Sequence, residues 1–443
     1  MSSDPARSPT ISGWVYLRLV LLGALIGVPA ALLAVGFLGL VHYLQHWVWT
    51  DLPDALGYDS PPWYLILLLP VVGAAIVAVA RTRLPGDGGH SPLDGIGGGP
   101  PVPLAHAPGI ALAAVATLVF GGVLGPEAPL IALGAVVGMA VQSFMRVDAR
   151  EGAVLSTAGS FSAISALFGG PIVAGVLMME GAVGMSAALA VLLPGFVAAA
   201  VGYVIIVGFG DWGGLDVPGL AVPDLPPYEG THVRDLLLAV VVGLVAAVAV
   251  AVVHALARRL EGEGRARLGL TRLLLGGGAA VGLLALTADG LGADSQDVLF
   301  SGQASVPSLV AEDSTKIIVI LLVAKGIAYA VSLGCGFRGG PVFPAIFLGI
   351  GLATFAVAWF DVSPTWAIAV GAAAGTAAAT RMLLTSMLLG GLLVGTTGLD
   401  AIPATVLAAC TAWLVVAALE RGSSGGGAAA HGAGSSPVRR RRA

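Results

Sequence analysis

The sequence has few charged residues and almost no cysteine. Charged residues make up 10% of the 443 residues, and Cys335 and Cys410 are the only cysteines. A soluble domain carries about 25% charged residues, so this chain lacks the polar side chains that would cover a surface in water. Two cysteines in apolar segments are typical of packing residues rather than of a disulfide framework. The formal net charge of −4 includes no basic excess, so we expect no nucleic-acid partner.

Apolar residues, in contrast, make up 57% of the chain and form long runs. A helix needs about 20 apolar residues to cross a lipid bilayer, so these runs predict an all-α polytopic membrane protein. The 65 glycines and 27 prolines interrupt several runs, most clearly at 171–209. Irregular backbone at membrane depth must be buried in protein or line an aqueous cavity. The composition therefore predicts broken and re-entrant helices around a transport site.

The placement of arginine predicts the orientation. Arg81 and Arg83 follow the second apolar run, five arginines lie in 258–272, and the chain ends in the basic segment 439–442. The loop 210–232 is acidic. Because cytoplasmic loops of membrane proteins are enriched in arginine and lysine, we expect a multi-pass plasma-membrane protein with both termini in the cytoplasm.

An internal repeat divides the chain into two halves. Six of ten positions in 125–134 are identical in 340–349, at a constant offset of 215. The expected organisation is a cytoplasmic N-terminus 1–13, a first half 14–209, an external linker 210–232, a second half 233–419 and a disordered basic cytoplasmic tail 420–443. Because the first half begins in the cytoplasm and the second outside, the halves would be inverted, as in many transporters.

Each repeat copy places glycine and proline directly before an apolar helix. The first N–H groups of a helix lack backbone partners and lie at the positive end of its dipole, so they bind anions. Two such helix starts, related by an inverted repeat, would face each other near the middle of the membrane. They predict a site for a small anion. The alternative is that both segments are tight turns that allow close helix packing.

Glu127 is an intramembrane carboxylate at the start of the first copy, and Val342 occupies the symmetric position. Intramembrane ionisable residues are functional candidates by default. We predict that the Glu127 carboxylate competes with the anion and withdraws on protonation, which makes it a gate and a candidate proton acceptor. The alternative is a carboxylate that only caps the helix. Glu180 is interpreted as a structural acid bound to buried N–H groups, with a part in a proton route as the alternative.

The remaining candidates are cationic or lie in a glycine-rich loop. Lys325 and Arg338 would make the pore potential positive, or would extend to a membrane interface. Ser91 or His90 could contact the anion from the cytoplasmic side.

His42 and His46 have metal-like spacing but no glutamate follows His42, so we expect an interfacial belt, no metal site and no cofactor. Neither a nucleophile–base pair nor a metal motif is evident, so we expect no enzyme.

Four segments resemble motifs of the CLC chloride channels and proton-coupled chloride transporters. They are Gly121–Pro129, similar to G-R-E-G-P; Pro171–Glu180, similar to P-L-A-G-x-x-F-x-x-E; Lys325–Pro344, similar to K-x-x-x-T-x-L-T-x-G-S-G followed by G-G-x-F-x-P; and Gly88–Pro92, similar to G-G-S-G-I-P. The resemblance implies a CLC-like fold, a homodimer with one pore per subunit, and a gating role for Glu127. The predicted anion ligands are the N–H groups of Glu127, Ala128, Val342 and Phe343, with Ser91 or His90 on the cytoplasmic side.

Three positions depart from the family pattern. Pro126 replaces an arginine, and Pro341 offers no N–H group where the family presents a donor. Gly181 stands where the proton-transporting members carry a second glutamate. We therefore predict chloride or small-anion transport through a pore gated by Glu127, with a proton-coupled chloride or fluoride antiporter as the alternative. The sequence is typical of a divergent bacterial-type member.

Overall fold

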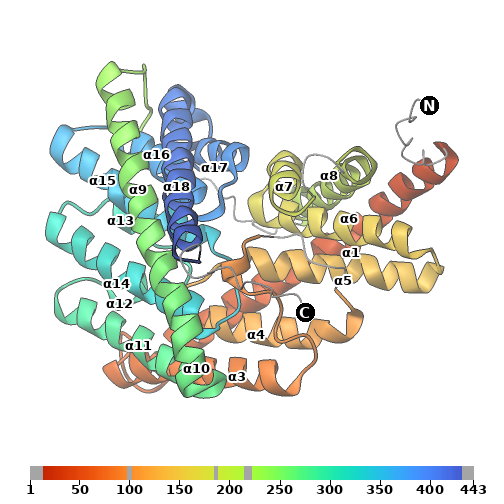
Figure 1. The fold of residues 1–443 in the computed structure, drawn as a ribbon, viewed down its shortest axis with the longest axis horizontal. Coiled ribbons are helices and arrows are strands. Elements are labelled where there is room, and N and C mark those ends of the chain that lie inside the picture. The colour runs from red at the N-terminus through yellow and green to blue at the C-terminus, as the bar shows by residue number, and fades with distance from the viewer. Residues whose placement is uncertain (1–12, 97–101, 184–187, 214–221, 432–443) are drawn as a thin grey trace, which may run out of the picture.

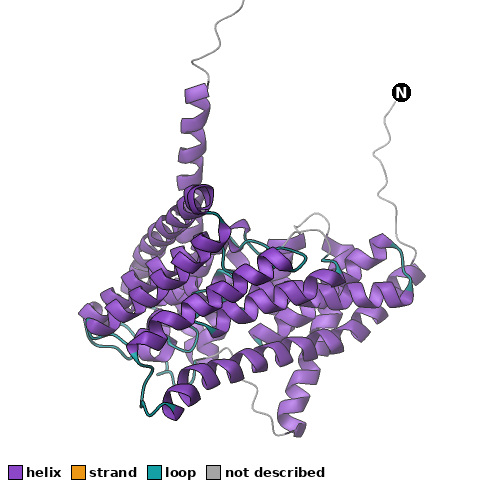
Figure 2. Ribbon diagram, turned by 90° about the horizontal axis from the view of Figure 1, so that it is seen from below, coloured by secondary structure: helices purple, strands orange, loops and turns teal. Residues whose placement is uncertain are grey.

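The computed structural model describes residues 13–96, 102–183, 188–213 and 222–431. These residues form helices joined by loops, and no strand is present among them (Figure 2). Nine helical segments in this described part are long and apolar enough to cross a membrane. The prediction of an all-α polytopic membrane protein is confirmed.

Two sets of helices correspond to the two halves of the repeat. The first set comprises α1 Gly13–His46, α2 Leu52–Ala55, α3 Trp63–Arg83, α4 Ala107–Val119, α5 Glu127–Met145, α6 Ala149–Phe168, α7 Pro171–Met178 and α8 Ala188–Gly213. The second set comprises α9 Val233–Arg259, α10 Arg265–Leu268, α11 Leu270–Gly290, α12 Ser295–Val298, α13 Val306–Val310, α14 Thr315–Cys335, α15 Val342–Phe360, α16 Pro364–Thr380, α17 Leu383–Val394 and α18 Ile402–His431. Figure 1 shows the sets side by side, except that α3 lies beside α11 of the second set.

The same helix pair packs closely in both halves. Gly134 of α5 faces α6 so closely that an added Cβ would lie 2.5 Å from the Gly159 carbonyl oxygen. In the second half an added Cβ on Gly349 of α15 would lie 2.0 Å from the Gly371 carbonyl oxygen of α16. Gly134 and Gly349 are matched positions of the repeat, so glycine at this position lets two backbones touch in each half.

Broken helices occur where glycine and proline predict them. The 171–209 run is divided: α7 has 8 residues, a π-helical turn covers Met179–Val183, and α8 begins at Ala188. α4 has 13 residues. Neither α4 nor α7 is long enough to cross a bilayer alone.

Some boundaries differ from those expected. α8 continues to Gly213, into the expected linker 210–232. α18 continues to His431, although we expected a disordered tail from residue 420. The expected N-terminal segment 1–12 and the tail 432–443 lie outside the described residues.

Candidate functional site

The two copies of the repeat contact each other through backbone hydrogen bonds. The Gly125 N–H donates to the Gly340 carbonyl oxygen at 2.8 Å, and the Gly340 N–H donates to the Gly125 carbonyl oxygen at 2.6 Å. The pair is antiparallel. Two residues beyond each glycine a helix begins, α5 at Glu127 and α15 at Val342. The two helix starts that the repeat singles out are therefore neighbours in space.

The Glu127 carboxylate lies on the N-terminus of the helix from the opposite half. Its Oε1 accepts hydrogen bonds from the Val342 N–H at 2.6 Å and from the Phe343 N–H at 3.4 Å. Glu127 is fully buried. A helix N-terminus is an anion site, and here a carboxylate of the protein occupies it.

Glycine makes room for this carboxylate on both sides. An added Cβ on Gly125 would lie 1.9 Å from Oε2 of Glu127, and one on Gly340 would lie 2.2 Å from its Cδ. Oε2 itself has no hydrogen-bond partner among the described residues. The side chain thus fills a cavity that any residue larger than glycine would close.

Two contacts hold the second copy in place, and sequence reasoning missed both. The Tyr329 hydroxyl of α14 donates to the Pro341 carbonyl oxygen at 2.8 Å. The Phe343 ring stacks on Phe168 of α6 with ring centroids 5.8 Å apart. The sequence did contain a sign of the Tyr329 contact, because a tyrosine inside an apolar run has a buried hydroxyl that needs a hydrogen-bond partner.

Ser91 and His90 lie in the loop before the short 3₁₀ helix Pro92–Asp94. His90 is exposed, and Ser91, directly before this helix, is half-buried. Within the described part of the chain, no hydrogen bond joins either side chain to Glu127 or Val342. Ala128, the second residue of α5, lies beside Glu127 at the helix start. The assignment of anion contacts to Ser91, His90 and Ala128 stays a prediction.

Lys325 is fully buried, so the alternative that it extends to an interface is wrong. Its Nζ donates to the carbonyl oxygens of Asp297 and Leu299, both at 2.8 Å, at the end of α12. The ammonium also lies 4.6 Å from the centroid of the Phe347 ring. Lys325 therefore neutralises the negative end of a short helix.

Arg338 is 5% exposed, and its guanidinium group bonds to Asp87, whose side chain is 52% exposed. Its Nη2 donates to Oδ2 of Asp87 at 2.7 Å, and its Nε donates to the Asp87 carbonyl oxygen at 3.0 Å. Arg338 precedes the second repeat copy directly. A positive charge is thus fixed beside the segment that holds Glu127.

Glu180 binds the start of α17. Its carboxylate accepts from the N–H groups of Leu384 at 2.9 Å and Thr385 at 2.8 Å, and from the Thr385 hydroxyl at 2.7 Å. A carboxylate at a helix start satisfies unpaired donors. The Leu384 N–H lies at an exposed position rather than among the buried N–H groups that we expected, and the role of Glu180 stays a prediction.

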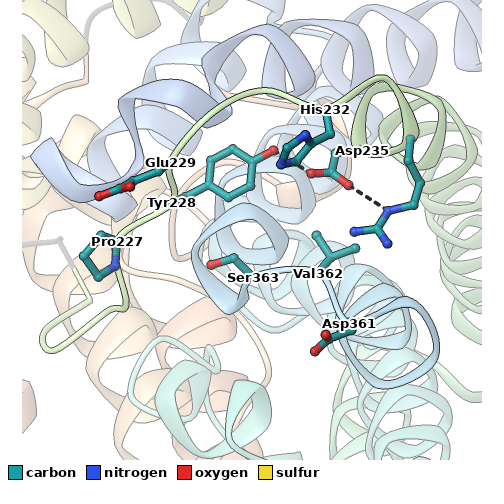
Figure 3. A pocket seen from close by; sticks show the side chains of 9 residues that line it. Pro227, Tyr228, Glu229, His232, Asp235, Asp361, Val362 and Ser363 are labelled. Atoms are coloured by element: carbon teal, nitrogen blue, oxygen red, sulfur yellow. Dashed lines mark hydrogen bonds and ion pairs between the residues drawn. The ribbon is translucent and has the colours of Figure 1, made fainter.

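A separate hollow of about 380 Å³ lies at the starts of α9 and α16 (Figure 3). Tyr228 and Asp235 line it and contact each other: the Tyr228 hydroxyl donates to Oδ2 of Asp235 at 2.7 Å. Nε of Arg234 donates to Oδ1 of Asp235 at 3.2 Å. Burial and the Asp235 carboxylate raise the pKa of Tyr228. The hollow has no lining residue in common with the Glu127 site.

Known proteins match this chain in sequence and in fold. YfeO of Escherichia coli strain SMS-3-5, described as "Putative ion-transport protein YfeO", is 29% identical over 343 residues, 74% of this chain and 76% of that protein. A slow cyanobacterial Cl⁻/H⁺ antiporter superposes with a TM-score of 0.76 at 16% identity, covering 91% of this chain and 95% of that one. A CLC-type fluoride/proton antiporter superposes with a TM-score of 0.70 at 20% identity, covering 92% and 97%.

The family described as voltage gated chloride channel matches residues 91–417. This range includes both repeat copies and therefore Glu127 at the start of α5 and Val342 at the start of α15. Because the match covers more than half of the 443 residues, it establishes membership by itself. The chain belongs to the voltage-gated chloride channel family.

Proposed function

We propose that this protein moves chloride or a similar small anion across the plasma membrane, through a pore that the Glu127 carboxylate blocks. The observation that carries the proposal is the hydrogen bond from the Val342 N–H to Oε1 of Glu127. A carboxylate oxygen and a chloride ion compete for the same donors. Ionised Glu127 thus occupies the place of the transported anion.

Protonation of Glu127 would release the site. A protonated carboxyl has lost its charge, so it is the weaker acceptor for the N–H groups of Val342 and Phe343. The anion then binds these donors, together with the helix start at Glu127 and Ala128, while Ser91 or His90 contacts it on the cytoplasmic side. Arg338 contributes positive potential. Glu180 and Lys325 support the site by holding helix ends.

We further propose a homodimer with both termini in the cytoplasm. Exposed apolar side chains on α8 and α18 offer faces for lipid or for a second copy; they include Leu193, Val204, Leu407 and Leu414. The basic segment 258–272 and the acidic segment 210–232 support the orientation.

The test is anion flux into liposomes that contain purified protein. Wild-type flux is expected to rise as the pH falls, because protonation removes the block. Glu127→Gln is expected to abolish this pH dependence, since the amide cannot ionise. An E127Q variant with the pH profile of wild type would overturn the gating role.

The second candidate is proton-coupled exchange. Glu127 is a fully buried carboxylate in the proposed pore, so it can carry a proton as well as block the anion. Gly181, where the proton-transporting relatives carry a second glutamate, opposes this candidate. A chloride gradient that drives proton uptake into liposomes would favour exchange, whereas chloride flux without proton movement would favour a channel.

A further inference from the structure

Three fully buried polar side chains lie on one face of α14. They are Lys325, Tyr329 and Ser332. Residues that are four and then three positions apart follow one another along the same side of a helix, so these side chains form a continuous row, here called the α14 stripe. Polar groups buried among apolar helices are costly unless each has a partner. The partners of the α14 stripe therefore show which segments this helix holds.

Tyr329 and Ser332 bind the backbone of both repeat copies. The Val123 N–H donates to Oγ of Ser332 at 3.1 Å, and Val123 lies two residues before the first copy. The Tyr329 hydroxyl donates to the carbonyl oxygen of Pro341, which belongs to the second copy. A single turn of α14 is thus bonded to the backbone at both helix starts, one from each half.

Lys325 reaches the first copy through an intervening turn. Its Nζ donates to carbonyl oxygens at the end of α12, including that of Leu299 at 2.8 Å. The next residue, Phe300, donates its N–H to the Gly121 carbonyl oxygen at 3.4 Å, and an added Cβ on Gly121 would lie 3.2 Å from Cδ2 of Leu299. The turn also closes around the lysine, because an added Cβ on Gly302 would lie 2.6 Å from Cε of Lys325. The ammonium group therefore fixes this turn against the backbone that leads into the first copy.

The same ammonium group contacts the second copy. It lies 4.6 Å from the centroid of the Phe347 ring, and Phe347 belongs to the repeated segment 340–349. In the part of the chain that the structure describes, the hydrogen bonds of Nζ go to three backbone carbonyl groups and not to a carboxylate. The carbonyl dipoles and the aromatic face compensate the buried charge. Moving Lys325 would leave this charge uncompensated, so its position is fixed.

The contact between the two copies at Glu127 depends on distance. Oε1 of Glu127 accepts from the Val342 N–H at 2.6 Å, and the two residues belong to different halves. A charge-assisted hydrogen bond weakens when its partners separate. The bonds between Gly125 and Gly340 join the copies to each other, whereas the α14 stripe joins both copies to one helix. The stripe is therefore placed to set the separation of the carboxylate and its donor.

We propose that Lys325, Tyr329 and Ser332 are positioning residues of the gate, which hold both copies at the separation at which ionised Glu127 binds the Val342 N–H. In this role none of the three touches the transported anion. The proposal rests on the proposed function, in which this carboxylate blocks the pore. Loosening the stripe weakens the binding of the ionised carboxylate, so the pore is blocked only at a higher pH.

The test uses the full-length protein in liposomes and measures the midpoint pH of anion flux and the midpoint temperature of unfolding. Ser332→Ala removes the acceptor of the Val123 N–H. Lys325→Met removes the ammonium group and keeps an unbranched side chain. Each variant is expected to raise flux at alkaline pH and to move the flux midpoint upward by about 0.5–1 pH unit, which corresponds to the loss of one hydrogen bond.

Two exposed residues provide matched controls. Lys316 also lies in α14, and its Nζ donates to the Leu291 carbonyl oxygen at 3.1 Å, but the residue is exposed. Ser143 of α5 is exposed and donates to the Met139 carbonyl oxygen of its own helix. K316M and S143A are expected to keep the flux midpoint of wild type.

The flux midpoint separates positioning from a purely structural role. A residue that only stabilises the fold lowers the unfolding temperature and the amount of flux but leaves the midpoint in place. Unchanged midpoints in S332A and K325M therefore overturn the proposal, and so do equal shifts in K316M and S143A. If K325M does not fold, the midpoint of S332A decides.

The E127Q background tests whether the stripe acts through Glu127, because this variant has no carboxylate to ionise. There S332A should leave the ratio of alkaline to acidic flux at the E127Q value, and a further change in this ratio overturns the proposal. Absence of wild-type flux, or a wild-type pH profile in E127Q, would instead reject the proposed function. pH-dependent wild-type flux with unchanged midpoints in the stripe variants rejects the positioning role alone.

Discussion

The two copies of the repeat have the same geometry but different chemistry. Each begins a helix directly after a glycine–proline pair, and the two glycines, Gly125 and Gly340, bond to each other. The first copy then carries Glu127 and the second carries Val342. A single acid thus reaches across to the helix start of the other half. The two copies together form the proposed anion site, and Glu127, which is present in only one of them, is its proposed gate.

The largest effect on stability and on pH dependence is expected from a substitution at the contact between the two copies. Gly340→Ala places a Cβ 2.2 Å from Cδ of Glu127 and should expel the carboxylate from the Val342 N–H. Overpacking of this kind costs about 1–3 kcal/mol of unfolding free energy. Flux should lose its pH dependence and remain high at alkaline pH. Thermal unfolding and pH-dependent flux measure both effects.

Gly391→Ala is the control for this variant, since an added Cβ at Gly391 of α17 would meet nothing within 4 Å. A G340A protein with wild-type stability and a wild-type pH profile would contradict the described packing of Glu127.

Moving the acid from position 127 to position 342 tests whether the two helix starts are equivalent. Glu127→Val alone should give flux that does not depend on pH. Adding Val342→Glu places a carboxylate at the symmetric position, from which it can reach the start of α5. The double variant is expected to regain part of the pH dependence, with lower flux at high pH than at low pH. If the double variant matches E127V at every pH, the two helix starts are not equivalent anion receptors.

A smaller effect is expected from the contact that supports the second copy. Tyr329→Phe leaves the buried Pro341 carbonyl oxygen without its donor, which should lower the unfolding free energy by about 1–2 kcal/mol. The chloride dependence of flux should weaken as well, because Pro341 precedes the Val342 N–H. The control is Tyr43→Phe in α1, where the residue is 66% exposed. Equal stability of Y329F and Y43F would argue against this support.

The smallest effect is expected at Glu180. Glu180→Gln weakens the cap of α17 and should cost about 1 kcal/mol of stability. If the residue is structural, the pH profile of flux and any proton movement should match wild type. The exposed Glu229 provides the control as Glu229→Gln. A selective loss of proton movement in E180Q would instead place Glu180 in a proton route.

The sequence predicts the features that depend on local pattern. The repeat at a fixed offset indicates the halves, and the glycine–proline pairs indicate the helix starts that meet at the site. The interruption near Gly181 indicates a broken helix. These features follow from short segments, because helix starts and breaks are set by neighbouring residues.

Contacts between distant segments could not be predicted in the same way. Asp87 and Arg338 are 251 residues apart. Lys325 binds carbonyl groups of another element, which the sequence does not mark as a partner. Which charge meets which depends on how whole helices pack, and a single sequence holds no record of that packing.

The paired bonds between Gly125 and Gly340 also constrain how the protein is made. They join residues 215 positions apart, so Glu127 enters the membrane well before its partner exists. At the usual synthesis rate the interval is on the order of 10–40 s. During that time the buried acid has no helix start to bind. The contact between Glu127 and Val342 can therefore form only after the second half has been synthesised.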